Sequence, residues 1–168
     1  MPAVTYSRLA DVDWQNWRAQ QPAVLLFVIK DEKVLLIHKK RGLGAGKINA
    51  PGGRIDAGET SLQAAIREVE EEVRVTPIGI EYCGELAFQF VDGLSIHVEV
   101  FRAGDCIGEP QETDEALPLW ARIDEIPFDK MWADDREWIP LMLARKKFKG
   151  KFLFDGDKML GHEIELLS

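Results

Sequence analysis

The chain has 168 residues, 46% of them hydrophobic and 30% charged, and a formal net charge of −8 at pH 7. This length suits one domain with a full-sized hydrophobic core. The negative charge argues against a nucleic-acid polymer as a partner, because a phosphate backbone requires a basic surface. A small anionic ligand stays open, since a metal ion can link acidic side chains to phosphate groups.

The first segment, residues 1–21, is predicted to be an extension that precedes one domain over residues 22–168. It lacks the apolar run of a signal peptide. Trp14 and Trp17 are three positions apart and could form the apolar edge of a short helix packed on the domain.

The cysteines and the hydropathy pattern favour a cytoplasmic protein that does not enter a membrane. Cys83 and Cys106 have no metal-ligand spacing and fit reduced thiols. The longest apolar stretch, residues 23–29, is far too short to cross a bilayer and predicts a buried strand. A monomer is expected, with a dimer left open.

The first predicted elements are a hairpin and a glycine-rich loop. Two apolar runs, residues 23–30 and the run that starts at residue 34, flank the polar turn DEK. Residues 41–53, RGLGAGKINAPGG, contain five glycines and a proline. A loop of this length is expected to be functional.

The clearest helix is predicted over residues 60–73, TSLQAAIREVEEEV. Thr60 or Ser61 can cap its first turn. Its apolar residues follow the spacing of one helix face, namely Leu62, Ala65, Ile66, Val69 and Val73.

The rest of the chain predicts a mixed α/β domain without an internal linker. Its expected elements are strands over 82–90 and 95–101, an acidic loop over 104–116, a short strand over 117–123, a helix over 134–147 and a final hairpin around the turn DGD. Pro140 lies in the second turn of the second helix, so that helix is expected to be kinked or to start later.

The helix over residues 60–73 carries glutamates that should repel one another. With Leu62 at zero and ~100° per residue, Glu68, Glu71 and Glu72 fall at about 240°, 180° and 280°, on one exposed stripe opposite the apolar face. A solvated acidic face is the simplest interpretation of such a stripe. The adjoining glycine-rich loop favours a site for Mg²⁺, or for Mn²⁺, because hard oxygen ligands suit these ions.

The stretch GGRIDAGETSLQAAIREVEEEVRV, which begins at Gly52, resembles the Nudix box, the signature of hydrolases that act on a nucleoside diphosphate linked to another group. One position differs, because Arg74 stands where the family has a glycine at the helix exit. The resemblance implies a Nudix α/β/α sandwich, a mixed β-sheet flanked by helices. The likeness runs from about residue 23 to residue 167, and KKRGLGAGKINAPGG and MWADD are similar to the branch that hydrolyses oxidised purine nucleoside triphosphates.

The resemblance also implies roles for single residues. Glu68, Glu71 and Glu72 would hold the metal, with Gly53 offering its carbonyl or a close approach. Glu59 and Arg67 would pair with each other. The catalytic group is expected to be Glu68, Glu71, Glu72 and Glu115, and the choice of general base stays open among Glu68, Glu71 and Glu115.

A base pocket is expected from residue chemistry as well. Aromatic faces stack on purines, an asparagine can read a base edge, and two adjacent carboxyls can share a proton if they are buried. Leu43 replaces a family aromatic, which would widen one wall. The expected substrate-binding residues are Lys39, Leu43, Asn49, Phe88, Trp132, Asp134, Asp135 and Trp138.

Each of these residues also has a simpler interpretation. Asp134 and Asp135 could cap the following helix, the tryptophans could be core residues, and Asn49 could be a turn residue.

The expected function is a Mg²⁺-dependent pyrophosphohydrolase that removes oxidised purine nucleoside triphosphates. The alternatives are hydrolysis of ADP-ribose, a dinucleotide polyphosphate or an ordinary triphosphate, and a catalytically silent nucleotide sensor.

Overall fold

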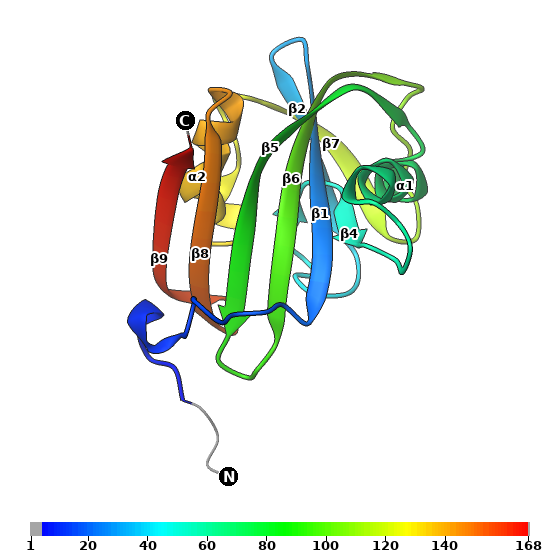
Figure 1. The fold of residues 1–168 in the computed structure, drawn as a ribbon. Helices are drawn as coiled ribbons and strands as arrows, with labels where there is room; N and C mark the ends of the chain where they lie inside the picture. The colour runs from blue at the N-terminus through cyan, green and yellow to red at the C-terminus, as the bar shows by residue number, and fades with distance from the viewer. Residues whose placement is uncertain (1–4, 168) are drawn as a thin grey trace.

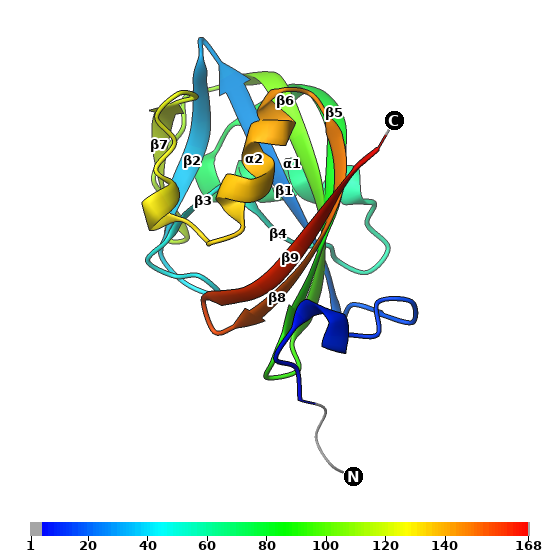
Figure 2. The same ribbon diagram turned by 90° about the vertical axis from the view of Figure 1, so that its left-hand side faces the viewer.

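The structure, a computed structural model, describes residues 5–167 (Figure 1). A mixed β-sheet runs through it in the order β3-β2-β1-β6-β5-β8-β9, with β4 paired to β1 and β7 paired to β2. The pairs β1/β6 and β5/β8 are parallel, and the other pairs are antiparallel. Helices α1 and α2 cover opposite faces of this sheet (Figures 1 and 2). The predicted α/β/α sandwich is confirmed.

The elements in chain order are the 3₁₀ turn η1 (Leu9–Asp11), β1 (Gln21–Lys30), β2 (Lys33–Lys39), β3 (Ile48–Asn49), β4 (Gly52–Arg54), α1 (Ser61–Val73), β5 (Thr76–Phe90), β6 (Ser95–Ile107), β7 (Ala116–Arg122), the 3₁₀ turn η2 (Phe128–Lys130), α2 (Asp135–Leu143), β8 (Lys147–Asp155) and β9 (Lys158–Leu167). No helix within residues 5–167 is long and apolar enough to cross a membrane.

Two hydrophobic layers lie on either side of the sheet because side chains alternate along β1. Val24, Leu26 and Val28 pack with α1 in one layer. Phe27 packs with α2 in the other, with its ring centroid 5.7 Å from that of Trp138. Both helices are therefore held by strand residues that are adjacent in sequence.

The predicted hairpins are confirmed, with a shorter first turn. β1 and β2 are joined by Asp31 and Glu32 alone, since Lys33 already pairs with Lys30. Both turn residues have positive φ, 53° and 61°, the backbone that a two-residue hairpin turn requires. The final hairpin, β8 and β9, turns at residues 156–157.

Several predicted boundaries are wrong where pairing extends or interrupts a segment. The loop over 41–53 contains β3, which pairs with β2, and the start of β4, which pairs with β1. β5 and β6 pair out to Thr76 and Ile107, so both strands are longer than expected and the acidic loop is shorter.

The second helix is also shorter than predicted. α2 ends at Leu143, and Arg145 adopts φ +60°, which no α-helix accommodates. Arg145 instead forms an ion pair of 2.7 Å with Glu81 on β5. Pro140 lies inside α2.

The expected helix around Trp14 and Trp17 is wrong. The 3₁₀ turn lies earlier, at Leu9–Asp11, and the two tryptophans follow in turns with ring centroids 5.5 Å apart. Their segment packs on the domain, because η1 contacts β8 and β9.

Candidate active site

Helix α1 starts at the predicted cap but turns a different face to the core. The Thr60 hydroxyl accepts from the Gln63 N–H, and the Gln63 side chain accepts from the Thr60 N–H, a capping box. Leu62 is 44% exposed, whereas Glu72 is 5% exposed. The buried face is centred near Ala65 and Val69, at about 300° and 340° on the same wheel, which brings Glu72 at about 280° inside. The expected exposed stripe is therefore wrong for Glu72.

Three carboxylates converge beside this helix. Glu68, Glu72 and Glu115 each offer an oxygen, and these atoms lie within 4.8 Å of one another. Burial, and next the charge of Glu68, raise the pKa of Glu72 to about 8, while the Gly52 N–H donates to it over 3.2 Å. Burial also raises the pKa of Glu68.

Glu115 reaches this cluster because hydrogen bonds attach its loop to α1 and to the residue that follows β2. The Thr113 hydroxyl donates to the Glu72 carbonyl over 2.7 Å, and the Glu115 N–H donates to Thr113 Oγ1 over 3.3 Å. The Lys40 N–H donates to the Glu115 carbonyl over 3.0 Å. Residues 113–115 are thereby attached to the end of α1 and to the end of β2.

Glu71 lies outside the cluster. Its side chain is 51% exposed, and an oxygen lies 3.3 Å from Arg67 Nη1. Arg67 also pairs with Glu59 at 2.7 Å, which confirms the expected pair, and with Glu68 at 2.7 Å. The hydrogen bond from Arg67 is the largest cause that lowers the pKa of Glu59 to about 2.

Gly53 passes directly over the cluster. A Cβ at this position would lie 2.6 Å from Cδ of Glu68, so the Glu68 carboxylate would have to shift to make room for it. The absence of a side chain on Gly53 therefore lets β4 run against the Glu68 carboxylate in its present position, which agrees with the expected close approach.

The donor set fits a divalent cation. Three carboxylate oxygens converge at one point, and burial raises the pKa of two of these acids, Glu68 and Glu72. A bound cation would favour the ionised form of both carboxyls. Mg²⁺ and related ions take such oxygen ligands and keep waters and substrate phosphates in the remaining positions. Glu68, Glu72 and Glu115 could hold the ion, and Glu71 would need to move to join them.

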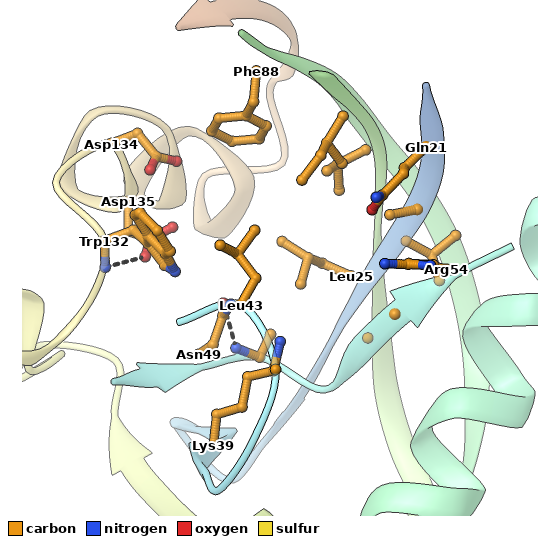
Figure 3. Close-up of a pocket in the computed structure, with 18 of the residues that line it drawn as sticks. Gln21, Leu25, Lys39, Leu43, Asn49, Arg54, Phe88, Trp132, Asp134 and Asp135 are labelled. Atoms are coloured by element: carbon orange, nitrogen blue, oxygen red, sulfur yellow. Dashed lines mark hydrogen bonds between the residues drawn. The ribbon is translucent and has the colours of Figure 1, made fainter. Parts of the chain in front are cut away.

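A cavity of about 300 Å³ opens next to the cluster (Figure 3). Glu72 and Gly53 line it, so the carboxylate cluster and the cavity share a wall. All the side chains expected to bind substrate also line it: Lys39, Leu43, Asn49, Phe88, Trp132, Asp134, Asp135 and Trp138.

The aromatic wall of the cavity is held by ring packing. Phe88 stacks on Phe152 with centroids 5.1 Å apart, and Trp132 meets Phe90 edge-on at 6.1 Å. Gly44, at φ +80°, passes so close that a Cβ there would lie 2.7 Å from Trp132 Nε1. Trp138 is fully buried and serves the core as well as the cavity.

Asp134 and Asp135 are a buried carboxyl pair at one end of the cavity (Figure 3). The Trp138 Nε1–H donates to Asp134 Oδ2 over 2.7 Å, and the Trp132 N–H donates to Asp135 Oδ2 over 3.1 Å. Burial raises the pKa of Asp134 to about 6, and burial with the Asp134 charge raises the pKa of Asp135 further. Asp134 makes no side-chain cap bond to α2, so capping does not explain its position.

Other lining residues were not predicted from the sequence, and the apolar ones carry no chemical signal there. Ala23, Leu25, Phe90 and Ile96 line the cavity as ordinary strand residues of β1, β5 and β6, and Gln21 and Arg54 lie across from the carboxyl pair (Figure 3). Strand alternation around Phe88 could have indicated Phe90. Asn49 is a strand residue, not a turn residue, and its Oδ1 accepts from the Ala50 N–H over 2.8 Å.

Known proteins are similar to this chain in sequence and architecture. The model of the NUDIX domain matches residues 19–142. The chain is 46% identical over 143 residues to the oxidized purine nucleoside triphosphate hydrolase of Danio rerio, covering 84% of this chain and 92% of the relative. It is 39% identical over 142 residues to the Mus musculus protein of that name, covering 83% and 91%.

A solved structure agrees with this relationship. The MutT protein from Bacillus halodurans superposes with a TM-score of 0.78 at 27% identity, over 86% of this chain and 97% of that one. A glutamate-rich helix after a glycine-rich loop, a sheet between two helices and these matches lead to one conclusion: the chain belongs to the Nudix family and is a Nudix hydrolase.

Proposed function

We propose that this Nudix hydrolase converts oxidised purine nucleoside triphosphates, of the 8-oxo-dGTP and 2-oxo-dATP type, into monophosphate and pyrophosphate before a polymerase can use them. The main supporting observation is that a single cavity is lined both by the buried pair Asp134 and Asp135 and by Glu72 of the carboxylate cluster. The names of the vertebrate relatives support the same substrate class.

The carboxyl pair suits the edge of an oxidised purine. A pair that holds one proton presents a donor and an acceptor at the same place. Oxidation at C8 or C2 changes the pattern of carbonyl and N–H groups on the base, and a shared proton can follow that change. Trp132 and Phe88 supply flat apolar surfaces for stacking.

The opposite end of the substrate is a triphosphate, which needs positive charge. Lys39 and Arg54 line the cavity and supply it. Nudix hydrolases use divalent metal ions, and we propose Mg²⁺, with Mn²⁺ as a substitute. When bound at the cluster, a divalent ion would polarise phosphoryl oxygens and lower the pKa of water.

In the proposed reaction, water attacks a phosphorus atom and the bond to the oxygen between the α and β phosphates breaks. Pyrophosphate leaves, and the proton of the water passes to a carboxylate of the cluster. Glu68 and Glu115 are the candidates for this base, because Glu71 faces solvent beside Arg67. Glu72, which lines the cavity, would hold the ion together with the other two carboxylates.

Pyrophosphate release with Mg²⁺ tests the proposal. The panel is 8-oxo-dGTP, 2-oxo-dATP, dGTP, dATP and ADP-ribose, and the two oxidised nucleotides should have the highest kcat/KM. A preference for ADP-ribose would refute the substrate assignment, and binding without turnover of any nucleotide would indicate a sensor. Full activity of both Asp134→Asn and Asp135→Asn on the oxidised nucleotides would refute the role of the carboxyl pair.

The proposal extends to the state of the protein in the cell. We propose a cytoplasmic monomer that binds a small nucleotide and no nucleic-acid polymer, in keeping with the net charge of −8. Sedimentation of the purified chain at micromolar concentration checks the oligomeric state.

A further inference from the structure

The segment before β1 is fastened to the far end of the β5–β6 hairpin. The Trp17 Nε1–H donates to Oε1 of Gln89 over 2.9 Å. The Gln20 N–H donates to Oγ of Ser95 over 2.9 Å and to its carbonyl over 3.1 Å. Gln89 and Ser95 pair across β5 and β6. Figure 1 shows the segment crossing the lower ends of β8, β5 and β6 before it enters β1.

Trp17 supplies a partner that Gln89 needs. Gln89 is 6% exposed, and its Nε2 donates to the carbonyls of Phe90 at 2.8 Å and Leu94 at 3.3 Å, across the hairpin turn. The remaining polar atom, Oε1, accepts from the Trp17 indole. A buried acceptor that loses its donor is costly, so without this bond the hairpin end would relax until water reaches Gln89.

The same hairpin end forms a wall of the base cavity. Phe88 and Phe90 flank Gln89 in sequence, Ile96 follows Ser95, and all three line the cavity. Because side chains alternate along a strand, Gln89 points to the opposite face while its neighbours point into the cavity. The hydrogen bond from Trp17 to Gln89 therefore also restrains the backbone that carries Phe88 and Phe90.

We propose that Trp17 is a positioning residue for substrate binding: it holds the wall formed by Phe88, Phe90 and Ile96 in the shape that accepts the base. The identity of the base rests on the proposed function. The match to the NUDIX domain model begins at residue 19, so Trp17 lies in front of the matched region.

Kinetics of Trp17→Phe test this role, with Trp14→Phe as the matched control. Trp14 lies in the same segment, 5.5 Å from Trp17 between ring centroids, but its Nε1–H donates to the carbonyl of Leu9 and not to the hairpin. Trp17→Phe should raise KM for 8-oxo-dGTP about three- to tenfold with kcat within about twofold, because fewer molecules have a competent cavity. Trp14→Phe should change neither. Equal KM values in the two variants, or a fall in kcat alone, would overturn the proposal.

Hydrogen exchange gives a readout that does not depend on turnover. Amides of residues 88–96 should exchange faster in Trp17→Phe than in Trp14→Phe. In the unmodified protein, saturation with 8-oxo-dGMP should slow exchange of the Trp17 indole proton, because coupling between binding and the hairpin is reciprocal. Unchanged exchange at this indole would overturn the proposal even if the variants fail to fold.

The two proposals can fail separately. If the enzyme prefers another nucleotide, the substrate assignment fails, and the comparison of Trp17→Phe with Trp14→Phe is repeated with that nucleotide and its monophosphate. The positioning role then stands or falls on the difference between the two variants.

Discussion

Replacing Asp134 by asparagine should stabilise the fold at neutral pH while impairing activity on oxidised purines. Asp134 is 2% exposed and accepts a hydrogen bond of 2.7 Å from Trp138. Asparagine has nearly the same shape, keeps an oxygen for this bond and carries no charge. The substitution therefore removes the buried charge and leaves the packing in place.

The size of the effect follows from the pKa of Asp134, which burial raises from 3.8 to about 6. A carboxyl whose pKa is higher in the folded state destabilises that state as pH rises above the unfolded value, and the full penalty is reached above the folded value. A shift of about 2 units corresponds to about 3 kcal/mol. The penalty is about 1 kcal/mol near pH 4.5 and about 3 kcal/mol near pH 7.5. The advantage of Asp134→Asn should thus grow by about 2 kcal/mol over this range.

Urea unfolding of both proteins at these two pH values, followed by tryptophan fluorescence, measures the difference. Asp129→Asn is the control, because that side chain is 96% exposed and its substitution should show no such trend. A stability difference that is the same at both pH values, or a variant less stable than the original at pH 7.5, would refute the reasoning that Asp134 is ionised at a stability cost. Pyrophosphate release from 8-oxo-dGTP in the same samples checks the accompanying loss of activity.

Three further predictions concern α1 and the strand over it. Glu72→Gln should lower kcat by about 100-fold or more and weaken Mn²⁺ binding in calorimetry. Glu70→Gln should change neither, because the Glu70 side chain accepts a hydrogen bond from Thr76 outside the cluster; equal Mn²⁺ affinity in the two variants would contradict a metal site at Glu72. Gly53→Ala should weaken Mn²⁺ binding about 10-fold or more, because its Cβ would lie 2.6 Å from Glu68 Cδ, and Gly104→Ala, which meets nothing within 4 Å, should bind as before. Arg74→Gly should raise the free energy of unfolding by about 0.5–1 kcal/mol, because Arg74 adopts φ +63° at the helix exit; a less stable variant in urea would contradict this.

The local elements of this chain could be predicted from sequence because their causes are local. The cap at Thr60, the glutamate-rich helix and the hairpins depend on neighbouring residues and on strand alternation. Arg74 stands where the family has a glycine, and the structure shows that Arg74 itself takes the left-handed conformation at the helix exit. The ends of β5, β6 and α2 were misjudged, because pairing partners and the turn at Arg145 decide where they stop.

The sequence by itself predicted which residues could carry chemistry: the glutamates of α1, Gly53, and the carboxyl and aromatic groups that line the cavity. Only the tertiary structure decided which of them meet. Periodicity gives the angles between side chains on a helix, but the position of the sheet decides which angle faces the core, and here it turns Glu72 inward and leaves Glu71 in solvent. Glu115 joins Glu68 and Glu72 because hydrogen bonds from Thr113 and Lys40 bring a distant loop to α1, a contact between separated segments that no local pattern encodes.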